Sequence, residues 1–415
     1  MLRLMSFLAS ALIVEMVFFG PLGLLLFGIP VRKVLIAGLI LCSIVPTLLR
    51  RTNERWQVWL LLSFVLFLAV WGFIVPASNG VDIRMTLAEV QPFVALLLIF
   101  PLYALFEAYG PQPYFKVLII STTVMACIVI GLWFASNVLG MIGVGLAARD
   151  FYIGLNDSDV GVYIGPMPDG SFRIMLINFI LFPIMMSYHN WRRFNVGWSA
   201  FYALAIFATG TRAFLGVGAI IIAAALIRRR AAVAIPAALI AGFFAASYIV
   251  TQQGVRIFDF TSDLTSSSAR YVQFFSLLNL FWSHPVFGAG FGASARVIRS
   301  IDAPYSYELT YVALLAKLGM VGASLVGGAM LIWLGRTMRH NANGISVAAL
   351  ALAIVLITAT NPYLINLVGM SIVAFLIAIG LWVNRSTYQS LTSPQVPADS
   401  FSQNPAHFYQ YQGRV

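Results

Sequence analysis

The sequence predicts an all-α fold: a polytopic integral membrane protein with about twelve transmembrane helices and two long external loops that contain interfacial helices. Hydrophobic residues make up 60% of the 415 positions and charged residues only 9%. Apolar stretches of roughly 15–23 residues recur along the chain, and a stretch of this length can cross a bilayer as a helix. Lysine and arginine gather at the ends of these stretches, as is typical of membrane spans. An ordinary soluble domain is therefore excluded.

The apolar stretches define one membrane domain, residues 1–383, followed by a polar segment, 384–415, that is expected to be a disordered cytoplasmic tail. The first stretch continues through "PLGLLLFGIP" without a cleavage-site pattern, so we expect it to be retained. The cysteines, Cys42 and Cys127, both fall inside apolar stretches and are expected to pack rather than to form a disulfide. The predicted spans are residues 5–28, 34–49, 57–75, 90–106, 117–138, 173–188, 197–210, 214–227, 233–250, 319–335, 345–360 and 365–383.

Basic residues in the short loops predict the orientation. With these spans, most of the basic residues fall on one side of the membrane, and the positive-inside rule predicts that this side is the cytoplasm. Both termini are then expected in the cytoplasm. Arg32 and Lys33 fall on the outer side, against the rule. The net charge of +11 is spread in ones, twos and threes at span ends, so it predicts contact with membrane lipids and no nucleic-acid partner. The residues on the cytoplasmic side are Arg50, Arg51, Arg55, Lys116, Arg192, Arg193, Arg228, Arg229, Arg230, Arg336 and Arg339.

The two long external loops, about 140–172 and 251–318, are too aromatic to be disordered linkers. In the second loop, "SSSARYVQFFSLLNLFWSHP" predicts a helix with an N-cap at Ser266 or Ser267 and an end at His284-Pro285. Its two faces differ, so we expect it to lie flat on the membrane. The polar face carries Arg270, Gln273, Ser276 and Asn279, and the apolar face carries Tyr271, Phe274, Phe275, Leu278, Phe281 and Trp282.

Arg212 lies in "TGTRAFLGVG", the tight external turn predicted between two spans. A lone arginine there would be explained by snorkelling to lipid head groups. Arg256, Arg270, Arg296 and Arg299 are expected on the same side, where the positive-inside rule gives no reason for them. Because guanidinium groups bind phosphate oxygens bidentately, these residues predict an anionic ligand at the outer face.

Other motifs are weaker. "GAGFGAS", residues 288–294, lacks the preceding strand and following acid of a dinucleotide site, so its glycines are expected to allow close backbone approach. Asp157 and Asp159 are assigned to loop structure, so no metal and no other cofactor is expected. Glu15, inside the first span, is expected to be protonated or to face the bundle interior. His284, next to a proline at a helix end, is expected to cap that end.

The order of "TGTRAFLGVG", "SSSARYVQFF" with "LFWSHPVFGAGFG", and "APYSYELTYVALLAKLGMVGA" resembles the O-antigen ligase and O-antigen polymerase family over roughly residues 170–335. The resemblance implies a membrane glycosyltransferase of the bacterial inner membrane whose active site faces the periplasm. Its donor would be a glycan linked to undecaprenyl diphosphate and its acceptor a glycan or lipid A-core. The partners implied extend to a chain-length regulator and a flippase.

The same resemblance implies that Arg212 and Arg270 grip the donor diphosphate, and we expect them to do so without a metal. From their place in the external loop, Arg256, Arg296 and Tyr271 are also expected to bind substrate. The family's usual His-Asn pair falls here at Tyr305-Ser306, a departure. Glu308, expected one helical turn after Tyr305, is then the candidate base, and Tyr305 the residue that orients the acceptor. This departure favours a repeat-unit polymerase of O-antigen, capsule or exopolysaccharide. The alternatives are an O-antigen ligase and a transporter of an anion or other solute.

Overall fold

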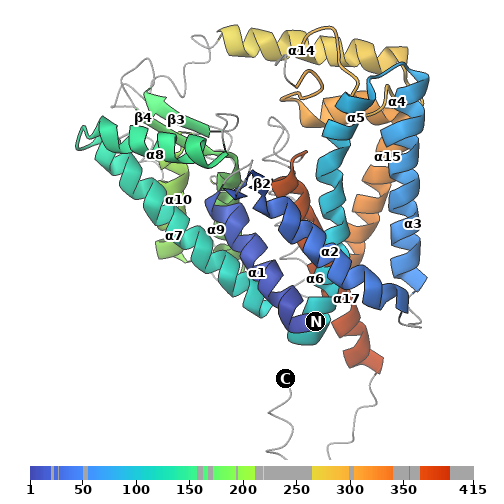
Figure 1. Ribbon diagram of the computed structural model, residues 1–415, viewed down its shortest axis with the longest axis horizontal. Helices are drawn as coiled ribbons and strands as arrows, with labels where there is room; N and C mark the ends of the chain where they lie inside the picture. Colours follow the sequence, from blue (N-terminus) through green and yellow to red (C-terminus); the bar gives the residue numbers. More distant parts are fainter. Residues whose placement is uncertain are drawn as a thin grey trace, which may run out of the picture.

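The computed structural model describes residues 1–19, 23–26, 28–49, 55–156, 162–166, 172–192, 195–210, 218, 264–298, 303–339, 355 and 365–392. This part of the protein is mostly helical, with long helices side by side and further elements laid across one end of the bundle (Figure 1). The spans predicted at 214–227, 233–250 and 345–360 lie outside the described residues, apart from Gly218 and Val355.

The segment up to residue 109 is mainly helical. In order it contains α1 (Leu2–Phe18), β1 (Leu25–Leu26), β2 (Ile29–Pro30), α2 (Val31–Leu49), α3 (Arg55–Ala69), the π-helix η1 (Val70–Ile74), α4 (Val75–Ser78), α5 (Ile83–Val90), the 3-10 helix η2 (Gln91–Leu98) and α6 (Ile99–Tyr109).

The described part of residues 112–392 contains further helices and a second antiparallel pair of strands. It contains α7 (Gln112–Asn137), α8 (Ile142–Asn156), β3 (Val162–Pro166), β4 (Phe172–Leu176), the 3-10 helix η3 (Ile177–Ile180), α9 (Leu181–Arg192), α10 (Val196–Ala208), α14 (Leu264–Ser283), α15 (Thr310–Arg339) and α17 (Leu367–Thr392).

Five helical segments in the described chain are long and apolar enough to cross a membrane: Gln57–Ser78, Ile83–Tyr109, Gln112–Asn137, Thr310–Met338 and Leu367–Asn384. Each overlaps a span predicted from the sequence, and α10 is a shorter apolar helix at another predicted position. The helical membrane class is therefore confirmed, and the number twelve stays a prediction.

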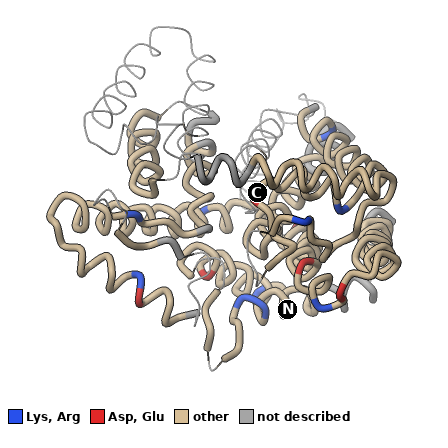
Figure 2. Tube along the Cα trace, turned by 90° about the horizontal axis from the view of Figure 1, so that it is seen from above, with Lys and Arg blue, Asp and Glu red and all other residues tan. Residues whose placement is uncertain are grey.

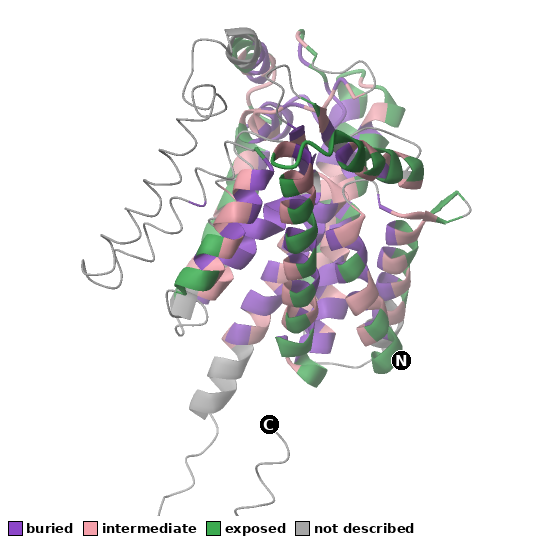
Figure 3. Ribbon diagram, turned by 90° about the vertical axis from the view of Figure 1, so that its left-hand side faces the viewer, coloured by how far each residue is buried: buried purple, intermediate pink, exposed green. Residues whose placement is uncertain are grey.

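The bundle core lies where α1, α6, α7, α9 and α17 meet. Phe375 of α17 packs edge-on against Phe106 and Phe115, with ring centroids 5.5 and 5.4 Å apart. Figure 3 shows buried residues toward the middle of the bundle and exposed ones on its outer surface. Such exposed apolar surface is expected where helices face lipid.

The ends of two predicted spans are corrected by backbone pairing. The span expected at 5–28 ends its helix at Phe18, and β1 and β2 form a short antiparallel pair beyond it. The span expected at 173–188 begins as β4, which pairs with β3, and its α-helix starts only at Leu181. Asn137 binds both backbone groups of Phe172, at 2.7 and 2.9 Å, and so holds the start of this strand on α7.

The C-terminal boundaries also differ from the prediction. α15 begins at Thr310, so the second external loop ends earlier than the expected residue 318. α17 runs to Thr392, so the helix continues into the segment expected to be a disordered tail, and residues 393–415 lie outside the described chain.

Both predicted loops contribute to the same end of the molecule. In Figure 1, α8, the β3–β4 hairpin and α14 lie at one end, whereas α1 begins and α17 finishes at the other. The first loop contains a helix followed by a hairpin rather than interfacial helices alone. Figure 2, seen from the α14 end, shows how few Lys, Arg, Asp and Glu positions the described chain contains.

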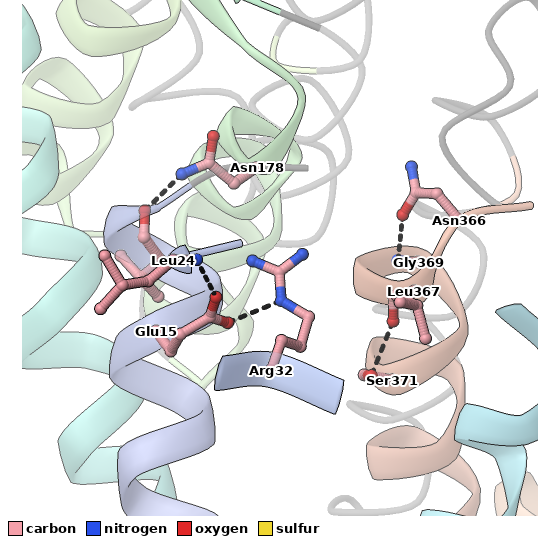
Figure 4. A network of polar contacts seen from close by, with 9 residues as sticks. Glu15, Leu24, Arg32, Asn178, Asn366, Leu367, Gly369 and Ser371 are labelled. Atoms are coloured by element: carbon pink, nitrogen blue, oxygen red, sulfur yellow. Dashed lines mark hydrogen bonds and ion pairs between the residues drawn. The ribbon is translucent and has the colours of Figure 1, made fainter. Parts of the chain in front are cut away.

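Glu15 and Arg32 form a buried ion pair between α1 and α2 (Figure 4). Arg32 Nε lies 2.6 Å from Glu15 Oε2, and the Leu24 amide donates to Glu15 Oε1 at 2.9 Å. Arg32 is 1% exposed and Glu15 is 4% exposed. The expectation that Glu15 faces the bundle interior is confirmed. Arg32, which contradicted the positive-inside rule, is neutralised inside the protein, so it does not act as a loop charge.

α15 is broken at Gly319, whose φ is 63° and ψ is −171°. The segment that follows α14, residues 285–290, fills the break. The amides of Ala289 and Gly290 donate to the carbonyls of Ala316 and Lys317, at 3.0 and 2.9 Å. On the other side of the break, the Met320 amide donates to the Pro285 carbonyl at 2.9 Å. Backbone groups that a continuous helix would pair internally are thus paired with the loop.

We expect Gly319→Ala to lower the free energy of unfolding by about 2–5 kcal/mol, because a Cβ at this left-handed position meets the Gly288 backbone. Thermal unfolding of the purified protein in detergent measures the change. Gly327→Ala, on the same helix, is the matched control, since its added methyl group meets no atom within 4 Å. Equal stability of the two variants would contradict this account of the break.

Candidate active site

The glycine segment Gly288–Gly292 runs close to other backbone at the end of the bundle that carries α14. Gly288, Gly290 and Gly292 have φ values of 75°, 85° and 82°, a left-handed region that side chains disfavour. A Cβ at Gly290 would lie 2.6 Å from Cδ of Pro76. The interpretation of these glycines as residues of close approach is confirmed.

Trp71, which follows α3, attaches the N-terminal helices to this segment. Its Nε1 donates to the carbonyls of Phe287 and Leu318, both at 2.9 Å, and its own carbonyl accepts from the Phe291 amide at 3.0 Å. Trp71 belongs to the π-helix η1, and such single π-helical turns occur frequently at functional sites. The break in α15 and the irregular turn after α3 are therefore parts of one hydrogen-bonded unit.

Below the segment lies a buried ion pair between Glu89 of α5 and Lys317 of α15. Lys317 Nζ is 2.5 Å from Glu89 Oε1, and the two residues are 1% and 4% exposed. The other carboxylate oxygen, Oε2, accepts from the Gly292 amide at 2.6 Å. Lys317 Nζ also donates to the Tyr305 carbonyl at 2.6 Å. Each ion therefore makes a second polar contact that helps to offset its desolvation.

Tyr305 and Tyr307 surround the ammonium group, with ring centroids 5.8 and 5.5 Å from Lys317 Nζ. Burial raises the pKa of Tyr305 above its ordinary value, and the negative charge of Glu89 raises it further. The pKa of Tyr307 is also raised, chiefly by burial, although its hydrogen bond from the Ala295 amide acts in the opposite direction. Both phenols are thus neutral at physiological pH.

Glu308 lies in the loop before α15 and not, as predicted, in the first turn of a helix that begins near Ser306. α15 begins at Thr310, so Tyr305 and Glu308 are not one helical turn apart. The physical reason is that the Glu308 amide donates to Gln273 Oε1 of α14, at 3.2 Å, and so pairs with another element. The segment 303–309, which we call the acceptor loop after the role proposed for it below, still contains both residues.

α14 lies across the end of the long helices (Figure 1), and two of its polar residues are buried against the protein. Gln273 and Ser276 are 6% and 9% exposed, and Ser276 Oγ accepts from the Val297 amide at 3.1 Å. Tyr271 and Trp282, on the opposite face, are both 66% exposed. The end at Ser283 is confirmed, whereas the helix starts at Leu264, ahead of the predicted serine caps. The two predicted faces are confirmed only in part, because Asn279 is exposed and Phe281 is buried in a cluster with Leu277.

The predicted arginines are only partly described. Arg212, Arg256 and Arg299 lie outside the described residues, and Arg270 is described only as a backbone position in α14, three residues before Gln273. Arg296 is exposed and lines an open groove of about 510 Å³ between α14 and residues 294–297. Other residues lining this groove are Phe275, Asn279, Ser283 and Ser294.

Among the described residues, no group of three or more His, Cys, Asp or Glu side chains is placed to hold a metal ion. Asp157 and Asp159 lie outside the described chain, so their assignment to loop structure stays a prediction. The ring of His284 lies 3.0 Å from Ser283 Oγ, at the end of α14.

Glu89 and Lys317 were missed by the sequence analysis. The predicted spans began at residues 90 and 319, so both ions were placed in loops just outside the membrane. The signal that would have found them is an ionisable residue of each sign within an apolar helical stretch, since such residues are usually paired and functional.

These features define a polytopic helical membrane protein in which one buried ion pair contacts both the glycine segment and the acceptor loop, and α14 binds the acceptor loop through Gln273. Residues 197–327 match the family model described as O-antigen ligase. The match confirms the resemblance to O-antigen ligases and related polymerases, which are glycosyltransferase-like membrane enzymes of polysaccharide biosynthesis. It includes the glycine segment, α14 and Lys317. No curated protein matches the chain in a sequence comparison.

We expect Tyr307→Phe to reduce the free energy of unfolding by about 1–3 kcal/mol, because it leaves the Ala295 amide buried without its acceptor. Tyr271→Phe is the matched control, since Tyr271 is 66% exposed, and it is expected to be neutral. Thermal unfolding of both variants makes the comparison. A neutral Tyr307→Phe would mean that this hydrogen bond contributes nothing to stability.

Proposed function

We propose that the protein polymerises undecaprenyl-diphosphate-linked oligosaccharide repeat units at the periplasmic face of the bacterial inner membrane. The observation that carries the proposal is the 3.2 Å hydrogen bond from the Glu308 amide to Gln273. Gln273 follows Arg270 by three residues on α14, so this bond brings the acceptor loop within one helical turn of Arg270, which we propose binds the diphosphate. The family match supports a glycosyltransferase with such a donor.

In the proposed reaction, an acceptor sugar hydroxyl attacks the anomeric carbon of the donor. The new glycosidic C–O bond forms as the bond to the diphosphate breaks, and undecaprenyl diphosphate leaves with the electron pair. Direct displacement inverts the anomeric configuration. Arg212 and Arg270 stabilise the negative charge that develops on the leaving group, and Arg256 and Arg296 extend this positive surface. The arginines supply this stabilisation without a metal ion.

The proton of the acceptor hydroxyl passes to the carboxylate of Glu308. Tyr305 is less suited to this role, because its raised pKa keeps the phenol protonated near neutral pH. A protonated phenol donates a hydrogen bond, so Tyr305 is assigned to orientation of the acceptor. Tyr271, on the exposed face of α14, is assigned to contact with the polyprenyl chain of the donor at the membrane surface.

An O-antigen ligase is the alternative, with lipid A-core as acceptor. The departure at Tyr305-Ser306 from the family's His-Asn pair favours the polymerase. A transporter is favoured less, because the helix break at Gly319 is paired with protein backbone, whereas transporter breaks bind the solute. A flippase that delivers the donor and a chain-length regulator are the proposed protein partners.

The proposal is tested with the purified protein in lipid nanodiscs, undecaprenyl-diphosphate-linked repeat units and EDTA. We expect a ladder of polymer on undecaprenyl diphosphate and release of free undecaprenyl diphosphate. Transfer to added lipid A-core without a ladder would support the ligase instead. Movement of solute across sealed vesicles without consumption of donor would support the transporter, and a requirement for Mg²⁺ or Mn²⁺ would contradict the metal-independent mechanism.

Arg270→Lys is expected to lose nearly as much polymerisation as Arg270→Ala, because the point charge of an ammonium cannot replace the planar fork of a guanidinium on a diphosphate. Polymer yield at equal protein abundance measures both variants. Arg84→Lys, at the exposed start of α5, is the matched control and is expected to be active. Normal polymer from Arg270→Lys would remove Arg270 from the diphosphate site.

Glu308→Gln is expected to slow polymerisation by about 10²–10⁴-fold at normal abundance, because it removes the base while the backbone bond to Gln273 is kept. Tyr305→Phe is expected to cost less, since it removes only an orienting hydroxyl. Initial rates at saturating donor separate the two. If Glu308→Gln is normal and Tyr305→Phe is inactive, the hydroxyl of Tyr305 has the more important role.

A further inference from the structure

The ion pair between Glu89 and Lys317 has no part in the reaction described above, although it lies directly beneath the acceptor loop. Both charges are within helices long enough to span a membrane, where an ion is expensive to bury and is usually functional. Its polar contacts also connect several separate elements. They join α5, α15, the glycine segment at Gly292 and the acceptor loop at Tyr305.

The contact to the acceptor loop is made through backbone. Lys317 Nζ binds the carbonyl of Tyr305, so the position of the loop does not depend on which side chain occupies residue 305. An ammonium held by a carboxylate in a low-dielectric interior binds such a carbonyl strongly.

We propose that Glu89 and Lys317 are positioning residues for glycosyl transfer. The pair fixes the Tyr305 carbonyl, and thereby sets the acceptor loop at the distance from α14 at which an acceptor hydroxyl meets the donor carbon. This role rests on the proposed function. Small displacements of this kind are costly, because a shift of about 1 Å in a reacting group lowers rates by about 10²-fold.

The test separates positioning from stability by removing both charges together. Breaking a buried pair by one substitution leaves an unpaired charge, whereas neutralising both partners is often tolerated. The double variant Glu89→Gln/Lys317→Met keeps an oxygen to accept from the Gly292 amide and keeps the length of the lysine stem. Glu15→Gln/Arg32→Met is the matched control, since that pair is equally buried and Glu15 accepts from the Leu24 amide, far from the acceptor loop in the sequence.

Two measurements are made on each protein. The first is the rate at which a membrane-impermeant maleimide labels position 306, using Ser306→Cys in a background with Cys42→Ala and Cys127→Ala. The second is transfer from the undecaprenyl-diphosphate donor, with kcat and the KM for donor and acceptor determined separately. Thermal unfolding reports whether each double variant is folded.

For the double variant at Glu89 and Lys317 we expect faster labelling, a kcat about 10²-fold lower, a higher KM for acceptor and an unchanged KM for donor. The control double variant is expected to match the wild type in labelling and transfer. Wild-type labelling and kcat in the folded Glu89→Gln/Lys317→Met protein would overturn the positioning role.

If the double variant does not accumulate, Glu89→Asp alone decides the question, because it keeps both charges but draws the carboxylate back by one methylene and so loosens its hold on Lys317. We expect faster labelling and a lower kcat than in the wild type, and wild-type values of both quantities overturn the proposal. If wild-type protein consumes no donor, the proposed function fails, and the labelling rates still decide whether the pair fixes the loop.

Discussion

The ion pair between Lys317 and Glu89 is the interaction on which the end of the protein that carries α14 depends. Withdrawing two charges from water costs several kcal/mol per ion, and an isolated pair in an apolar bundle does not fully recover that cost. Here each ion has a further partner, the Gly292 amide for Glu89 and the Tyr305 carbonyl for Lys317. The glycine segment and the acceptor loop are therefore needed by the pair, just as the pair is needed by them.

The same requirement for paired polar groups explains the broken helix. A membrane helix that is broken at Gly319 leaves carbonyls and amides without helical partners, and lipid cannot satisfy them. Residues 285–290 supply the missing partners, and Trp71 adds a further donor to the Leu318 carbonyl. Such close contact of two backbones excludes side chains, which accounts for glycine at both 288 and 319.

α14 then covers this unit. Gln273 and Ser276 use their side chains to bind the backbone of the segments beneath, Leu277 and Phe281 are buried beside them, and the other aromatic side chains of the helix are left facing outward. In water this would be an inverted amphipathic helix. At a membrane surface it is the favourable arrangement, because aromatic groups partition into the interface while the polar groups pair within the protein.

The class of fold could be predicted from the residue pattern alone, because apolar length and the placement of basic residues follow directly from the thickness and charge asymmetry of a bilayer. The pattern also predicted the reason for glycine at 288–292 and part of the two faces of α14, which follow from helical periodicity, but not the burial of Phe281 against another element. Only the tertiary structure decided that Glu89 binds Lys317, that β4 replaces the start of a predicted span, and that Glu308 lies outside the helix. Each of these depends on a partner distant in the chain, namely α15 for Glu89, β3 for β4 and Gln273 for Glu308, and local pattern contains no information on such partners.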